Sequence, residues 1–281
     1  SSGDAGDINI ETGSLTVENG AQISAQTKAS GEGGDINISG PEKLNITGDG
    51  EISASTSSTG QGGNIELKAT ETIDITGDGE ISVKTTGAGD AGNISIETPN
   101  LTTDKIKITA STEAEGTGGA ITAKTDTLSL DNNSQLTVEA NSSGDAGDIN
   151  IETGSLTVDN GAQVSAQTEG TGKGGNVNIT TRSVTAQNEA QINASTYSKG
   201  DAGNIDIRAT ELEIKDNAKI SARTIRTGEG GNIIINTPDT LNITGNGEIT
   251  VNSRGPGHAG TIDIISPNIT LSEGIDITAF T

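Results

Sequence analysis

Short runs of alternating apolar and polar residues recur along the whole chain. Each run has two apolar positions separated by one polar position, and Ile, Leu and Val fill most of them. The first three runs are centred on the pairs Ile8/Ile10, Leu15/Val17 and Ile23/Ala25. A period of two with β-branched residues is typical of β-strands, and no stretch carries the 3.6-residue period of an amphipathic helix. The pattern therefore predicts an all-β chain.

The apolar pairs are grouped in threes, and each group is one repeat of 27–29 residues. The first residue of the third pair is always 13 residues before the first residue of the next repeat's first pair, as for Ile23 and Ile36. Within a repeat, successive pairs start 7 or 8 residues apart. Constant spacing is what stacked coils require, because each strand residue must lie about 4.8 Å above its equivalent. We expect a right-handed parallel β-helix of ten coils with three short strands per coil. The coils begin near Gly6, Gly34, Gly63, Gly92, Gly119, Gly147, Gly175, Gly203, Gly231 and Gly260.

Two polar columns also repeat from coil to coil. Asp or Asn follows the coil-initial glycine in eight of the ten repeats, from Asp7 to Asn232, with Ala120 and Thr261 as the exceptions. We expect this column to form an amide-type hydrogen-bond ladder at one corner. A second column is mostly Thr, from Thr27 to Thr281, and predicts a hydroxyl ladder at another corner.

Composition narrows the class of partner. The 281 residues carry a net charge of −23, with one Phe, one Tyr and no Cys, Met or Trp. This acidity disfavours nucleic acid and anionic membranes, which are polyanions, and no apolar run is long enough to span a bilayer. We expect an exported bacterial protein, outside the cell or on its surface. Residues 1–281 read as a single β-solenoid domain cut from a longer repeat protein, because neither a signal peptide nor a capping coil is evident.

The order of the repeat elements resembles a known family. Gly-Asp-Ile-Asn-Ile at 147–151, Leu156-Thr157-Val158, Asn160-Gly161-Ala162-Gln163 and the glycine-rich turn at 144–147 are similar to the repeat region of filamentous-haemagglutinin-type exoproteins, especially the large cyanobacterial members. The resemblance covers all ten coils. It implies a β-helix, two-partner secretion, and roles in adhesion, aggregation or biofilm formation, with cell-surface glycans, matrix or other cells as partners. It implies no catalytic residues and no cofactor in these repeats.

Candidate chemistry is sparse. His258, the single histidine, lies in the loop column that precedes the coil starts, and a metal or acid–base role would need convergent partners. That loop column could attract calcium, but non-acidic residues interrupt it. Its members are Asp4, Glu32, Gln61, Asp90, Thr117, Asp145, Lys173, Asp201, Glu229 and His258. Because almost no aromatic side chain is present to stack on a sugar, a polysaccharide-active enzyme is disfavoured, and we expect no enzymatic activity.

Ice binding is the first alternative to an adhesive function, ahead of a polysaccharide-active enzyme. The outward column of the third strand is uniform and small, which could form a flat hydroxyl face, whereas its neighbour contains Lys84, Glu139 and Arg223. The small column is Ser24, Ser53, Ser82, Thr109, Thr137, Ser165, Asn193, Ser221, Thr250 and Thr278.

Two apolar residues are expected to point outward. Ile234 and Ile265 occupy positions that are polar in other coils. They lie on adjacent coils and predict a small interaction patch near the C-terminal end.

Overall fold

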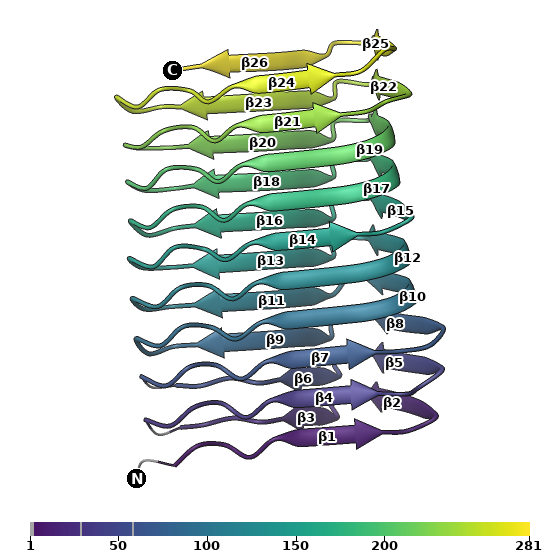
Figure 1. Cartoon of the computed structure of the whole chain (residues 1–281), viewed down its shortest axis with the longest axis vertical. Coiled ribbons are helices and arrows are strands. Elements are labelled where there is room, and N and C mark those ends of the chain that lie inside the picture. The colour runs from purple at the N-terminus through teal and green to yellow at the C-terminus, as the bar shows by residue number, and fades with distance from the viewer. Residues whose placement is uncertain (1–2, 29, 58) are drawn as a thin grey trace.

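The protein is a right-handed parallel β-solenoid of ten coils, as the sequence predicts (Figure 1). The computed structural model describes residues 3–28, 30–57 and 59–281. We number the coils 1 to 10 by their initial glycines. Each coil contributes three strand segments, and every pairing between coils is parallel. No helix long and apolar enough to cross a membrane occurs in the described residues.

The strands form two sheets. The larger contains the first and second segments of every coil, and the smaller contains the third segments. Separate first strands are β1 (Ile8–Glu11), β4 (Ile36–Ser39), β7 (Ile65–Lys68), β14 (Ile149–Glu152), β21 (Ile233–Asn236) and β24 (Ile262–Ile265). Separate second strands are β2 (Ser14–Glu18), β5 (Lys43–Thr47), β8 (Thr72–Thr76), β15 (Ser155–Val158), β22 (Thr240–Ile243) and β25 (Ile269–Leu271).

In four coils one strand runs through both segments. These strands are β10 (Ile94–Asp104), β12 (Ile121–Asp131), β17 (Val177–Ala186) and β19 (Ile205–Ile214). All four coils have the shorter, seven-residue spacing and no glycine at this position, so the ladder continues around the bend. The smaller sheet contains β3 (Gln22–Ser24), β6 (Glu51–Ser53), β9 (Glu80–Thr85), β11 (Lys107–Thr112), β13 (Gln135–Ala140), β16 (Gln163–Thr168), β18 (Gln191–Thr196), β20 (Lys219–Thr224), β23 (Glu248–Ser253) and β26 (Asp276–Phe280).

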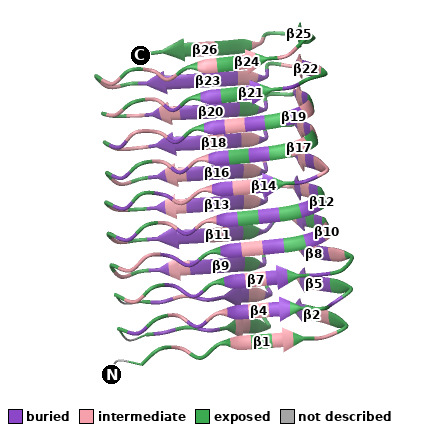
Figure 2. Ribbon diagram, in the orientation of Figure 1, coloured by how far each residue is buried: buried purple, intermediate pink, exposed green. Residues whose placement is uncertain are grey.

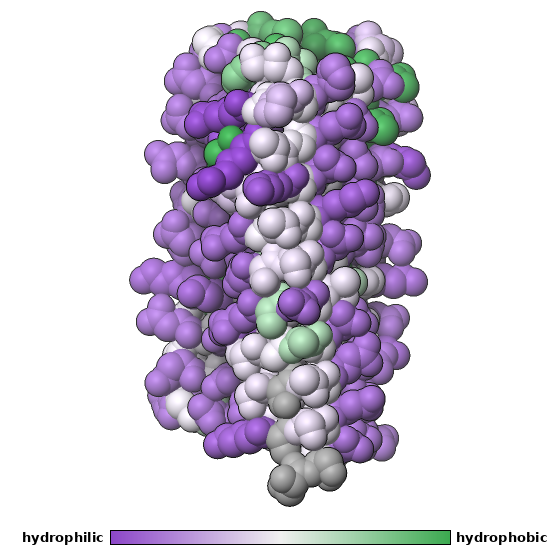
Figure 3. Space-filling model, turned by 90° about the vertical axis from the view of Figure 1, so that its left-hand side faces the viewer, coloured by the Kyte–Doolittle hydropathy of each residue, from purple (hydrophilic) through white to green (hydrophobic). Residues whose placement is uncertain are grey.

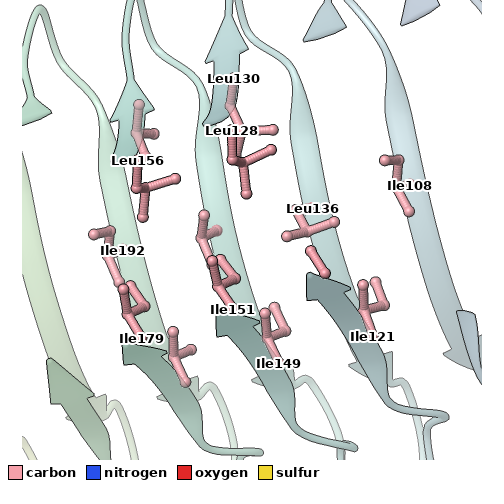
Figure 4. Packing of buried hydrophobic residues seen from close by; sticks show 14 of the residues in the cluster. Ile108, Ile121, Leu128, Leu130, Leu136, Ile149, Ile151, Leu156, Ile179 and Ile192 are labelled. Carbon is pink, nitrogen blue, oxygen red and sulfur yellow. The ribbon is translucent and has the colours of Figure 1, made fainter. Parts of the chain in front are cut away.

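The core is a set of continuous apolar columns. Ile121, Ile149 and Val177 lie directly over one another in β12, β14 and β17, and all three are fully buried. Figure 4 shows such residues from both sheets pointing into the interior, and Figure 2 shows that burial decreases toward the first and last coils. Each fully buried Ile or Leu contributes roughly 1.5–3 kcal/mol. Stability therefore comes from stacking, because a coil buries its inner face only against its neighbours.

The predicted Asp/Asn ladder is confirmed. The side-chain amide of Asn176 donates a hydrogen bond to the Asp148 carboxylate, with an N–O distance of 3.0 Å. The side-chain amide of Asn204 donates in the same way to the side-chain oxygen of Asn176, at 3.2 Å. The same acceptor oxygen also receives the backbone N–H of the next coil, as in Asn204 to Asn176 at 3.0 Å. Each side chain therefore caps the backbone above it.

The predicted Thr hydroxyl ladder is wrong. In five described coils the hydroxyl donates to the carbonyl five residues later in the same coil, as Thr168 does to Lys173 at 2.7 Å. The glycine-rich loop brings this carbonyl, which also accepts a backbone N–H from the loop below, close to the hydroxyl. In two other coils the hydroxyl instead donates to a carbonyl of the loop below, as Ser253 does to Gly228 at 2.8 Å. These bonds join hydroxyls to loop carbonyls and not to one another.

The corner between second and third strands uses left-handed backbone. In coil 6 the turn is Asn160-Gly161, with φ of 49° and 74°. Positive φ at both central positions is the geometry of a type I′ turn, which favours Asn and Gly. Coil 7 places Asn188 and Glu189 there, with φ of 51° and 66°. Because a non-glycine residue in this region is strained by about 1 kcal/mol or more, Glu189 is a local weak point.

We expect Glu189→Gly to raise the free energy of unfolding by roughly 0.5–1 kcal/mol, because relief of the strain exceeds the chain entropy that glycine adds. Urea unfolding followed by circular dichroism measures the shift. Glu189→Ala is the control: it removes the same exposed carboxylate but keeps the strain, and should be nearly neutral. Equal stabilisation by both variants would show that charge, and not backbone conformation, is responsible.

Candidate interaction surface

A shallow groove follows the corner between the first and second strands of coils 2 to 6. Its volume is about 630 Å³. One wall is formed by the last residues of the first strands, including Lys68, Glu97 and Lys124, and the other by the turn residues Thr70, Pro99 and Asp126. The floor is small and apolar or hydroxylated, with Ala69, Thr98, Thr125 and Thr153 all buried. We call this feature the first-corner groove.

The floor threonines fix the bend. The Thr153 hydroxyl donates to the Ser155 carbonyl at 3.0 Å, and Thr181 donates to Ser183 at 3.2 Å. Thr12, Thr98 and Ser266 make the same bond two residues ahead. The sequence pattern did not lead us to predict these bonds, although Ser or Thr two residues after the first apolar pair recurs in seven coils. Each of these bonds links the side chain at the bend to the backbone at or next to the start of the second strand.

Charged residues line one wall in a regular order. We define the charge stripe as the exposed column at the ends of the first strands: Glu11, Ser39, Lys68, Glu97, Lys124, Glu152, Thr180 and Arg208. From coil 3 to coil 6 the sign alternates at every step. Opposite charges on adjacent strands attract, whereas like charges would repel. The stripe is neutral overall, with three acidic and three basic residues, in a chain of net charge −23.

Two stripe residues also have partners on the adjacent column. The Lys68 ammonium lies 2.7 Å from the Glu66 carboxylate and 3.9 Å from that of Glu97. The hydrogen bond with Glu66, together with its negative charge, raises the pKa of Lys68, so Lys68 stays positively charged. The Arg208 guanidinium lies 2.8 Å from Asp206. These ion pairs are exposed and orient the side chains without adding much stability.

The two isoleucines predicted to point outward are exposed. Ile234 is 39% exposed and Ile265 is 56% exposed. They are diagonal neighbours, because Ile234 lies opposite Asp263, and Ile265 lies opposite Asn236. Ile269, Leu271, Ile277 and Phe280 are also exposed in coil 10, and Figure 3 shows apolar side chains gathered at this end. A contact role for Ile234 and Ile265 stays a prediction.

The acidic loop column has a structural use that the sequence did not predict. Four carboxylates of this column each accept a hydrogen bond from the backbone N–H of the equivalent residue in the next coil, at 2.7–3.0 Å; they belong to Asp4, Asp90, Asp145 and Asp201. Asp145, for example, accepts from Lys173. His258 is exposed in the same column. No group of three or more His, Cys, Asp or Glu side chains is arranged to hold a metal within the described residues. Figure 3 shows this face as a pale column of small residues with hydrophilic flanks.

The small column of the third strand is mostly covered. Ser53, Ser82, Thr137, Ser165, Ser221 and Thr250 are all buried. These six residues therefore do not form the exposed hydroxyl face on which the ice-binding alternative depends, and that alternative stays untested. The longer side chains of the flanking columns cover the small ones, as Gln26 does when it donates to Ser53 at 3.3 Å.

Comparison with family models, with curated proteins and with solved structures gives no match to this chain. The resemblance to the filamentous-haemagglutinin type stays a prediction.

Proposed function

We propose that this chain is a segment of an exported structural and adhesive filament that mediates adhesion, aggregation or biofilm formation at a bacterial surface. The observation that supports this most is the unbroken register of the first strands from β1 to β24. Ten coils stacked about 4.8 Å apart give a rod roughly 48 Å long. Such a rod extends a surface outward, and further coils of a longer chain would extend it further.

The repeat motif supports the same proposal. The ordered elements described for coil 6, residues 147–163, resemble the repeats of filamentous-haemagglutinin-type exoproteins. Export by two-partner secretion, and partners such as cell-surface glycans, matrix or other cells, belong to this proposal.

The two alternatives have less support. A flat hydroxyl face suited to ice would need an exposed small column, and that of the third strand is mostly buried. Sugar-active β-helices stack substrates on aromatic rings, and this chain has only Tyr197 and Phe280.

Beads coated with the chain test the proposal. We expect them to bind bacterial cells, or surfaces coated with glycan or matrix protein, or to cluster with one another, while beads coated with albumin stay dispersed. Absence of all four kinds of binding would contradict an adhesive role. Thermal hysteresis in the same preparation would favour ice binding instead.

A further inference from the structure

The charge stripe is complementary to its own reverse. Read from coil 1 to coil 8, its charges are negative, neutral, positive, negative, positive, negative, neutral and positive. Read backward, each charge meets one of opposite sign. If coil 4 faces coil 5 of a second copy, Glu97 faces Lys124, Lys68 faces Glu152, and Glu11 faces Arg208. The neutral residues Ser39 and Thr180 face each other.

The neighbouring columns bring no like charges together in this arrangement. In the column of turn residues between first and second strands, Glu42 of coil 2 faces Arg182 of coil 7. In the column before the stripe, Glu66 faces Asn150, and Asp206 faces Asn9. None of the described residues in these three columns meets a residue of like charge.

The lengths of the turns at this corner are also compatible with the reversed arrangement. Coils 2 and 3 have one extra residue between their first and second strands, and the turns that join β4 to β5 and β7 to β8 reach farther out than the ribbons of β10 and β12 (Figure 1). In the reversed arrangement these turns face coils 7 and 6, which lack the extra residue. The projecting turns of each copy therefore face corners of the other copy that do not project.

The register is specific. A shift of one coil in one direction brings Lys68 against Lys124, and brings Glu97 against its own copy. A shift in the other direction brings Glu97 against Glu152, and Lys124 against its own copy. A parallel arrangement in register places every charge against itself. Like-charge contacts exclude each of these alternatives.

The size of the face suits a stable pair. Glu11 and Arg208 are seven coil steps apart, about 34 Å, and six strand residues span about 20 Å. The product, about 700 Å² on each partner, is close to the roughly 800 Å² of a typical specific interface. At physiological salt the Debye length is about 8 Å, so the acidic residues on the other faces of the rods interact weakly across the pair.

The geometry points to a second copy of this chain as the partner of the first-corner face, packed antiparallel about a two-fold axis between coils 4 and 5. Such an isologous contact uses the same surface on both copies. This inference rests on the proposed adhesive function and names its partner: filaments associate side by side with their own kind. Coils 9 and 10 lie outside the paired region.

Sedimentation velocity of the whole chain tests the pairing. At about 150 mM salt we expect a dimer to form between about 1 µM and 1 mM protein. Glu97→Lys and Lys124→Glu each place two like-charge contacts across the two-fold axis and should weaken the dimer by at least about tenfold. The double variant exchanges both charges and should restore it.

Mixing the two single variants gives the most specific test of the pairing. Glu97→Lys leaves lysine at both central positions, and Lys124→Glu leaves glutamate at both. Neither should pair with itself, and the mixture should form a heterodimer. Loss of stability or a general change in net charge would not produce this rescue.

Matched controls carry the same charge changes on the glycine-rich loops. Glu169→Lys and Lys199→Glu are exposed and distant in the coil from the stripe. They should leave the dimer unchanged. A wild-type chain that stays monomeric up to about 1 mM, or a mixture of single variants that stays monomeric, would overturn the antiparallel pairing. Beads that still bind cells or glycans in that case would leave the adhesive function in place.

Discussion

Replacing Gly175 with alanine is expected to destabilise the rod by more than about 3 kcal/mol, because the new Cβ would overlap backbone of the coil below. The Cβ would fall far inside van der Waals contact with the carbonyl oxygen of Gly147 and would crowd that of Ala146. Backbone cannot move aside as a side chain can. Relief requires coils 6 and 7 to separate locally, which weakens the ladder on both sides.

Gly13→Ala is the matched control. A Cβ at Gly13 would meet no atom within 4 Å, so this variant should be neutral or slightly stabilising. Thermal and urea unfolding of both variants measure the difference. A Gly175→Ala variant as stable as Gly13→Ala would mean that the coils are not in contact at this column.

Insertion of one residue between Ile149 and Asn150 is expected to abolish cooperative folding of the central coils. The insertion turns every following side chain of β14 to the opposite face, so Ile151 would point to solvent and Asn150 into the core. Loss of apolar burial and burial of an unpaired amide both act against the fold. The expected result is a large decrease in the unfolding midpoint, together with protease cleavage near coil 6.

The protein contains its own control for this experiment. Coils 2, 3 and 9 already have one extra residue at the first corner, so insertion of alanine after Gly154 should cost less than about 1 kcal/mol, as expected for a surface loop. Equal damage from the two insertions would contradict the strand register described above.

The sequence predicted the fold because periodicity constrains a solenoid more strongly than it constrains a globular domain. The columns at Ile8 and Ala25 specify both the strands and their vertical neighbours, and the 13-residue spacing leaves little freedom in the loop between coils. The Asp/Asn ladder was predictable for the same reason, since like residues one coil apart lie within hydrogen-bonding distance.

Bonds within one coil were harder to predict. The hydroxyl of Thr168 had two available acceptors, one above and one in its own loop, and only the path of the loop decides between them. Burial of the small third-strand column, such as Ser165, depends on the lengths of flanking side chains and not on alternation. The residues of the charge stripe are visible in the sequence, but their alternation of sign becomes evident only when residues 27–29 positions apart are aligned in the register of the stacked coils.

Distances between spin labels along one column test the central claim, the vertical stacking of successive coils. Gln22, Lys107, Lys219 and Asp276 are exposed members of a single column of the smaller sheet, and the chain has no native cysteine. Cysteine pairs that join Gln22 to the other three span three, seven and nine coil steps. The account predicts label separations that rise linearly, with backbone distances of about 14, 34 and 43 Å. Distances that fail to increase with coil number would contradict it.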